Sequence, residues 1–158
     1  MGKGTVFSVY FPITKQIIVQ PLADKEKNMK DLPVKTATIL VVDDELLLVK
    51  INASRLRSKG YQVTTATESR EALELFRSQP EKFDVLITDQ TMPGLTGSEL
   101  AGEVLAIKPS LPVIMCTGHS DIFSEEEALQ LGIKKYVFKP LYGDELLDAV
   151  AEVLAESE

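Results

Sequence analysis

The chain has 158 residues, of which 44% are apolar and 26% charged, a composition typical of a soluble globular protein. Its formal net charge of −7 repels a phosphate backbone, so we expect no direct nucleic-acid partner. With one cysteine and one histidine, the chain cannot form an internal disulfide or a zinc site built from Cys and His.

The chain also lacks the usual signs of a membrane or secreted protein. No apolar run reaches the roughly 18 residues that a membrane helix needs, and the N-terminus has no signal-peptide pattern. We therefore expect a cytoplasmic location without direct membrane contact, although a longer parent protein is compatible with a membrane anchor.

Composition divides the chain into three parts. Residues 21–36 carry seven charged side chains and two prolines with almost no aliphatic content, which is typical of a linker. Residues 1–20 form a short segment before this linker. Residues 37–158 alternate short apolar runs with amphipathic stretches and are the expected folded domain.

Five apolar runs of strand length, rich in β-branched residues, predict β-strands. They are Thr38–Val42, Tyr61–Thr65, Phe83–Thr88, Pro112–Cys116 and Lys134–Phe138. We expect Cys116, in the fourth run, to be a buried and inert thiol.

Apolar residues at helical spacing between and after these runs predict five helices. The first places Leu46, Val49, Ala53 and Leu56 on one face and ends before Gly60; the second begins near Glu68 and uses Ala72, Leu75, Phe76 and Gln79; the third uses Leu100, Val104, Leu105 and Lys108 and ends at Pro109; the fourth spans Glu125 to Leu131 and closes at Gly132; the fifth uses Leu146, Val150, Val153 and Leu154. Strict alternation predicts a doubly wound α/β fold with a five-stranded parallel sheet in the flavodoxin-like order 2-1-3-4-5. Ligands of such sheets bind at the carboxyl ends of the strands, near strands 1 and 3.

Polar residues follow four of the predicted strands at this edge. They are Asp43 and Asp44 after the first strand, Asp89 after the third, Thr117 after the fourth, and Lys139 with Pro140 after the fifth. Three converging carboxylates repel one another unless a cation lies between them. Mg²⁺, or Mn²⁺ in its place, suits such oxygen ligands and leaves positions open for phosphate oxygens. A phosphoryl group on Asp89 would then share its charge with the metal, Lys139 and the Thr117 hydroxyl.

The same residues resemble the receiver domains of two-component response regulators. The resemblance rests on four motifs in order: Val41-Val42-Asp43-Asp44-Glu45; Asp89-Gln90-Thr91-Met92-Pro93-Gly94 with Gly97; Thr117-Gly118; and Tyr136-Val137-Phe138-Lys139-Pro140. It implies that Asp89 is the phosphoacceptor. It also implies that Asp44 binds the metal directly, Asp43 largely through water, and Thr91 through its backbone carbonyl.

The resemblance further implies that Lys139 pairs with the phosphoryl group and that the bond to Pro140 is cis. Thr117 and Tyr136 would act as a switch that changes the surface of the fourth helix, fifth strand and fifth helix. The implied partners are a histidine kinase core or a histidine phosphotransfer protein, and the altered surface also allows a homodimer.

The N-terminal segment carries a second, shorter resemblance. Residues 2–12, with the sequence GKGTVFSVYFP, look like the closing strand of a histidine-kinase ATP-binding domain. This implies that the chain is the C-terminal receiver of a hybrid sensor histidine kinase. We expect this chain itself to be no enzyme beyond self-phosphorylation and slow autodephosphorylation.

Two other functions fit parts of the pattern. A Mg²⁺ phosphatase or phosphotransferase also passes through an aspartyl phosphate, but such enzymes commonly place a second acid two residues after the nucleophile, where this chain has Thr91. An interaction domain without phosphorylation would not need Asp44, Asp89 and Lys139 intact. Singly, the residues also have structural interpretations: Asp43 and Asp44 suit a helix start, and Tyr136 suits core packing.

Overall fold

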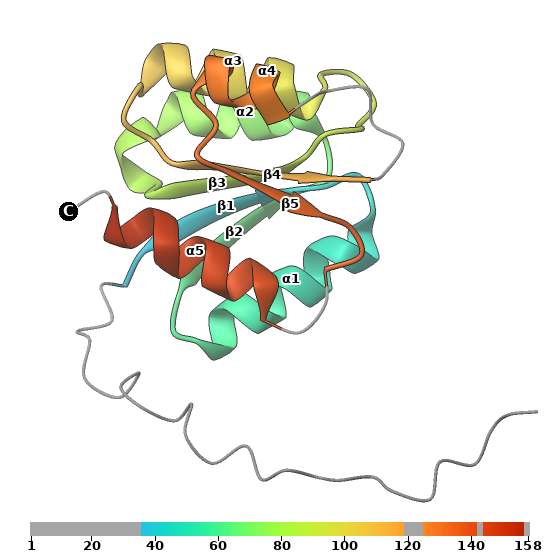
Figure 1. The fold of residues 1–158 in the computed structure, drawn as a ribbon, viewed down its shortest axis with the longest axis vertical. Helices are drawn as coiled ribbons and strands as arrows, with labels where there is room; N and C mark the ends of the chain where they lie inside the picture. The colour runs from blue at the N-terminus through green and yellow to red at the C-terminus, as the bar shows by residue number, and fades with distance from the viewer. Residues whose placement is uncertain (1–35, 119–124, 142–143, 157–158) are drawn as a thin grey trace, which may run out of the picture. The chain divides into compact units, whose positions relative to one another are not determined.

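The computed structural model describes residues 36–118, 125–141 and 144–156 (Figure 1). Residues 34–158 form one compact unit. The expected N-terminal segment 1–20 lies outside the described residues, as does the expected linker 21–36 apart from Thr36. Within the described ranges, no helix combines the length and the apolar character needed to cross a membrane.

Five parallel strands form one sheet in the order β2-β1-β3-β4-β5, which confirms the predicted fold class. The strands are β1 (Thr38–Val42), β2 (Gln62–Ala66), β3 (Val85–Asp89), β4 (Val113–Thr117) and β5 (Lys135–Phe138). β1, β3 and β4 are covered on both faces, so their residues form nearly continuous buried apolar runs.

Helices cover both faces of the sheet. They are α1 (Leu46–Ser58), α2 (Ser69–Ser78), α3 (Gly97–Ile107), α4 (Glu125–Leu131) and α5 (Glu145–Ala155), with a short 3-10 helix η1 (Pro80–Lys82) after α2. α1 and α5 lie on one face, and α2, α3 and α4 lie on the other (Figure 1). Each face has its own apolar core, which fixes the sheet between the two helical layers.

Some predicted boundaries were wrong by one or two residues. The third strand begins at Val85 rather than Phe83, because Phe83 turns its fully buried ring to stack on Phe76 at 5.8 Å between centroids. The second strand is shifted one residue later, since Ala66 pairs with Val42. The third and fourth strands also extend one residue further than predicted, because Asp89 pairs with Cys116 and Thr117 pairs with Phe138.

The predicted helical faces hold with two exceptions. Leu46 is 54% exposed, although it was placed on the buried face of the first helix with Val49, Ala53 and Leu56. Gln79 is exposed because α2 ends at Ser78. Helix α3 begins at a capping box, in which the Thr96 hydroxyl accepts from the Glu99 N–H at 3.2 Å and the Glu99 carboxylate accepts from the Thr96 N–H at 2.8 Å. This cap fixes where the loop after β3 ends.

Candidate functional site

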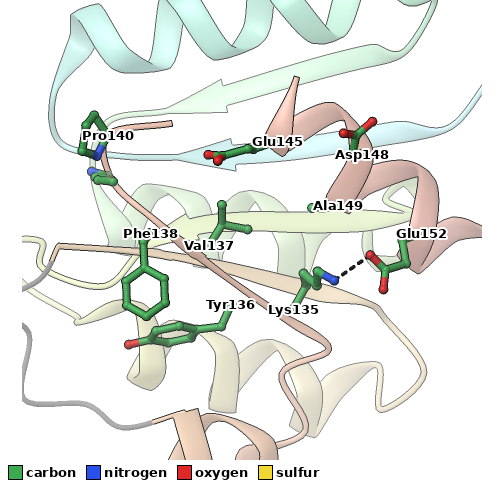
Figure 2. A pocket seen from close by; sticks show the side chains of 10 residues that line it. Lys135, Tyr136, Val137, Phe138, Pro140, Glu145, Asp148, Ala149 and Glu152 are labelled. Atoms are coloured by element: carbon green, nitrogen blue, oxygen red, sulfur yellow. Dashed lines mark hydrogen bonds and ion pairs between the residues drawn. The ribbon is translucent and has the colours of Figure 1, made fainter. Parts of the chain in front are cut away.

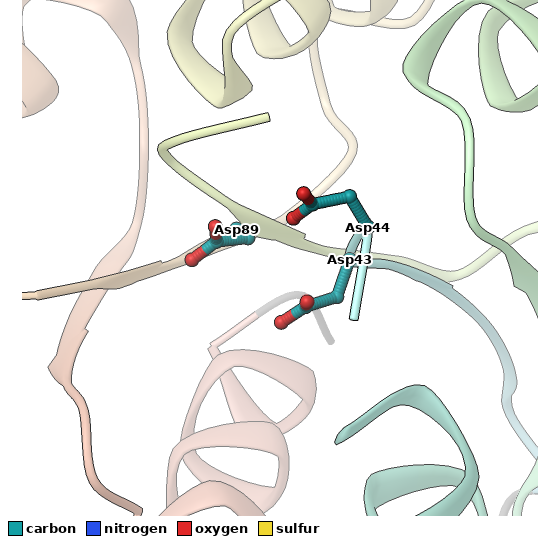
Figure 3. Close-up of side chains that lie close together, drawn as sticks. All are labelled: Asp43, Asp44 and Asp89. Atoms are coloured by element: carbon teal, nitrogen blue, oxygen red, sulfur yellow. The ribbon is translucent and has the colours of Figure 1, made fainter. Parts of the chain in front are cut away.

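Three carboxylates meet at the carboxyl edge of β1 and β3 (Figure 3). Asp43 follows the last residue of β1 and is buried, Asp44 is exposed, and Asp89 is the buried last residue of β3. One oxygen from each lies within 4.8 Å of the others. Strands β1 and β3 are hydrogen-bonded neighbours, so the convergence predicted from the strand order is present in the structure.

Local hydrogen bonds hold Asp43 in place. Its N–H donates to the Ala66 carbonyl at 3.3 Å, and its carboxylate accepts from the Glu45 N–H at 2.9 Å. The second bond is an Asx-type turn that leads from β1 into α1. The interpretation of Asp43 and Asp44 as acids of the helix start is wrong, because the N-cap of α1 is Glu45, no side chain caps the helix, and its first turn holds no acidic residue. The other carboxylate oxygen of Asp43 bonds Lys139.

Lys139 joins the two buried carboxylates. Its Nζ lies 2.8 Å from an Asp43 oxygen and 2.7 Å from an Asp89 oxygen. Its backbone N–H donates to the Thr117 carbonyl at 2.7 Å, which anchors the end of β5 to the end of β4. The Lys139–Pro140 peptide bond is cis, as the resemblance implied.

The electrostatics of the site follow from burial and charge. Burial raises the pKa of Asp89, although the hydrogen bond and charge of Lys139 work against that rise. Burial alone would lower the pKa of Lys139, but its hydrogen bonds to Asp43 and Asp89 and their charges outweigh burial, so this pKa is raised. Lys139 therefore stays protonated, and among the described residues it is the one ammonium group paired with this cluster of three carboxylates.

This donor set fits a hard divalent cation. The three clustered ligands are all carboxylate oxygens, which Mg²⁺ and Mn²⁺ prefer over the softer ligands of zinc. Three carboxylate charges and one ammonium charge leave two negative charges unbalanced, which a divalent cation would neutralise. Thr91 adjoins the cluster, since its N–H donates to an Asp89 oxygen at 3.2 Å.

The two predicted switch residues occupy different surroundings. Thr117 is the fully buried last residue of β4, and its hydroxyl donates to the Gly118 carbonyl at 3.2 Å. Tyr136 is half-buried on β5, packs on the core beside α2 and α3, and meets Phe138 edge-on at 5.4 Å between ring centroids. The structure thus places Thr117 at the edge of the sheet that carries the carboxylates. Tyr136 packs on the core, as its structural interpretation predicted.

A hollow lies beside this site rather than over it. It has a volume of about 510 Å³ and lies between β5 and α5, where Lys135 and Glu152 form an ion pair of 2.6 Å (Figure 2). Lys139 and Pro140 reach its wall, but none of the three clustered carboxylates does. The hollow therefore belongs to the outer surface of β5 and α5.

Two buried polar residues near Asp89 were missed by the sequence reasoning. Gln90 is 9% exposed and its side-chain oxygen accepts from the Ser98 N–H of α3; Ser69 is 1% exposed and its hydroxyl bonds the loop after β3. Gln90 stands inside the second motif and could have been singled out there. Ser69 gave no sequence signal, because it lies 24 to 26 residues before its partners.

Comparison with known proteins gives consistent similarities. The family model of the response regulator receiver domain matches residues 39–151. The transcriptional regulatory protein GlrR of Escherichia coli strain K12 is 36% identical over 123 residues, which are 78% of this chain and 27% of that protein. The two-component response regulator ARR12 of Arabidopsis thaliana is 39% identical over 108 residues, which are 68% of this chain and 18% of that protein. The chain thus spans about a quarter or less of the length of these relatives.

Solved structures give the same picture. A response regulator receiver domain protein from Clostridium thermocellum aligns with a TM-score of 0.72 and 34% identity, covering 76% of this chain and 95% of that chain. The chemotaxis protein CheY4 of Vibrio cholerae aligns with a TM-score of 0.69 and 30% identity, covering 75% of this chain and 99% of that one.

Proposed function

Because the chain belongs to the response regulator receiver domain family of two-component signalling, we propose that it accepts a phosphoryl group on Asp89 from a phosphohistidine. The observation that carries this proposal is the contact of Lys139 with both Asp43 and Asp89 beside a third carboxylate. An ordinary surface lysine would not be held by two buried acids.

In the proposed reaction, an Asp89 carboxylate oxygen attacks phosphorus in line with the leaving imidazole nitrogen. A P–O bond forms, and the P–N bond breaks with its electron pair going to the imidazole. Asp43, Asp44, Asp89 and the Thr91 carbonyl would hold Mg²⁺ or Mn²⁺, which when bound neutralises the charge of the phosphoryl oxygens.

The residues of the chain have distinct tasks in this reaction. Lys139 keeps Asp89 oriented before transfer and afterwards pairs with a phosphoryl oxygen, since its raised pKa keeps it cationic. Burial excludes water from one side of Asp89. The Thr117 hydroxyl, which bonds the Gly118 carbonyl, would turn to the phosphoryl group, and Tyr136 would change rotamer with it.

The intact mass of the full chain tests this proposal. The chain is incubated with Mg²⁺ and acetyl phosphate, beside a chelated sample and the variants Asp89→Asn and Asp148→Asn. Asp148 is an exposed carboxylate on α5 and serves as the matched control. We expect one added phosphoryl group in the wild type and Asp148→Asn, and none in Asp89→Asn or without metal. Labelling of Asp89→Asn, or no labelling of the wild type while another receiver is labelled, would refute the proposal.

The partner and output proposals rest on the same chemistry. The proposed phosphodonor is a histidine kinase core or a histidine phosphotransfer protein. The proposed output is a conformational change of the surface formed by α4, β5 and α5, which a second copy of the chain or another partner would bind. The net charge of −7 argues against direct nucleic-acid contact by this chain. We expect a cytoplasmic location. We also expect no turnover of generic phosphate esters, and a phosphatase assay of the phosphorylation-competent chain tests this second expectation.

The finer assignment to a hybrid sensor histidine kinase rests on residues 2–12, which lie outside the described residues. A regulator with an output domain is the alternative, since relatives such as GlrR are named transcriptional regulatory proteins and extend well beyond the matched part. Two measurements distinguish the hybrid kinase from the regulator with an output domain. One is the mass of the native protein, detected with an antibody to the domain; the other is peptide sequencing of the segments that adjoin residues 1–20.

A further inference from the structure

The loop between Asp89, the last residue of β3, and Gly97, the first of α3, is held by two buried polar side chains without a role in the proposed reaction. They are Gln90 and Ser69. In the hydrogen bonds of the described residues, neither side chain contacts the Asp89 carboxylate. The Gln90 side chain bonds Ser98 at the start of α3, and the Ser69 hydroxyl bonds the loop itself. Any role of these two residues at a metal site rests on the proposed function.

Gln90 closes the base of the loop. Its backbone N–H donates to the Cys116 carbonyl and its carbonyl accepts from the Gly97 N–H, both at 2.9 Å. Its side-chain oxygen accepts from the Ser98 N–H at 3.0 Å, and its Nε2 donates to the Ser98 hydroxyl at 3.3 Å. Four hydrogen bonds thus fix the residue after Asp89 to both β4 and α3.

Ser69 holds the far side of the loop. It is the first residue of α2, and its hydroxyl donates to the Pro93 carbonyl at 3.1 Å while accepting from the Leu95 N–H at 2.8 Å. Gly94, between these partners, has a φ of +89°, a conformation that favours glycine. The loop is therefore tied to α2 as well as to α3.

These contacts determine the shape of the segment that contains Thr91. A buried polar group that loses its partner costs free energy, so the bonded arrangement of the loop is strongly preferred. Residues that orient a metal ligand without touching the metal commonly affect its affinity. We propose that Gln90 and Ser69 are positioning residues, which hold the Asp89 carboxylate and the Thr91 backbone in the arrangement that binds a divalent cation.

Direct Mn²⁺ binding to the unphosphorylated full chain, measured by calorimetry, tests this role without relying on phosphorylation. The variants are Gln90→Met and Ser69→Ala. The matched controls are Gln62→Met, at an exposed position on β2, and Ser78→Ala, which loses a hydroxyl bond to the Leu75 carbonyl far along α2. We expect the Mn²⁺ dissociation constant to rise by about tenfold in each variant and to stay within about twofold in the controls.

Two further measurements separate positioning from general stability. In chelator, amide hydrogen exchange at Leu95 should accelerate in Ser69→Ala, and that at Ser98 should accelerate in Gln90→Met. Thermal unfolding in chelator reports loss of stability alone. Variants that unfold earlier yet bind Mn²⁺ as tightly as the wild type would overturn the inference, because a purely structural role predicts that result.

The outcomes also distinguish this inference from the proposed function. If the wild type is phosphorylated at Asp89 but Mn²⁺ affinity is unchanged in the variants, the positioning role fails and the function stands. If the wild type binds no Mn²⁺ and takes no phosphoryl group, the function itself fails. Should Gln90→Met not fold, Ser98→Ala removes the hydroxyl that contacts the Gln90 amide and the Thr96 hydroxyl, and it should weaken Mn²⁺ binding in the same direction as Ser69→Ala.

Discussion

Gly97 lies directly behind Asp89, and a side chain at Gly97 would overlap the Asp89 backbone carbonyl. A Cβ atom built there would also lie 2.8 Å from the Met115 sulfur. The Gly97 N–H bonds the Gln90 carbonyl at 2.9 Å, which draws the start of α3 against the end of β3. The position of the proposed phosphoacceptor therefore depends on the absence of a single methyl group.

Gly97→Ala should destabilise the protein by about 2 kcal/mol, because neither the backbone nor the β4 core yields easily to an added methyl group. Gly102→Ala is the matched control in the same helix. Among the described residues, a Cβ at Gly102 meets Leu131 Cδ1 at 3.7 Å, an ordinary contact distance, so the gain in helix propensity should stabilise the protein by about 0.5 kcal/mol. Urea unfolding in chelator measures both. Equal effects of the two substitutions would contradict the proposed crowding at Gly97.

Lys139 and Lys135, at opposite ends of β5, offer a second contrast. Lys139→Met leaves two nearly buried carboxylates without their cation, and we expect a loss of about 3 kcal/mol in chelator. Lys135→Met breaks an ion pair with Glu152 whose side chains are 37% and 52% exposed, and the loss should stay below about 1 kcal/mol.

Added Mg²⁺ should reduce the Lys139→Met deficit and leave that of Lys135→Met unchanged, because the cation replaces positive charge only at the carboxylates. Unfolding curves of both variants with and without Mg²⁺ check this. A Lys139→Met deficit that Mg²⁺ does not alter would mean that the ion binds elsewhere.

Cys116 should be unreactive in the folded protein. Burial raises the pKa of its thiol to about 12, so only about one molecule in ten thousand carries a thiolate at pH 8. A disulfide reagent should modify Cys116 at once in urea and only at the rate of unfolding in native buffer. Rapid modification of the native protein would show that β4 opens locally.

The fold was predictable because its periodicities are regular. Alternation of β-branched runs with helical spacing predicts the parallel sheet, and the edge of that sheet then gathers Asp43, Asp89 and Lys139. Leu46 was misplaced because spacing identifies a helical face but cannot say where along the helix its cover begins: at the start of α1, Leu46 is 54% exposed, whereas Val49 is 2% exposed. Phe83 was assigned to a strand because β propensity cannot distinguish a ladder residue from a core anchor that precedes it.

The site was predictable where its residues lie in motifs, and only there. Asp89 and Lys139 are 50 residues apart, but Asp89 ends β3 and Lys139 directly follows β5, so topology brings them together. Ser69 begins a helix whose first residue contacts the loop after β3 through one hydroxyl. Such a contact depends on how α2 packs, and packing has no local sequence signal.

The stability of the protein in chelator should depend on pH through Asp89. Burial raises the pKa of Asp89 above its ordinary value of 3.8, so the folded state binds this proton more tightly than the unfolded state does. The stabilising contribution of the protonated carboxyl is present below pH 3.8 and is lost as pH rises through the raised pKa.

Asp89→Asn, which keeps the neutral form, should therefore be more stable than the wild type at pH 7, and the difference should shrink toward pH 4. Unfolding free energies across this range, with Asp148→Asn as the control for net charge, measure it. A wild type that gains stability over Asp89→Asn as the pH rises would show that Lys139 outweighs burial, and that the ionised carboxylate is the favoured form even without metal.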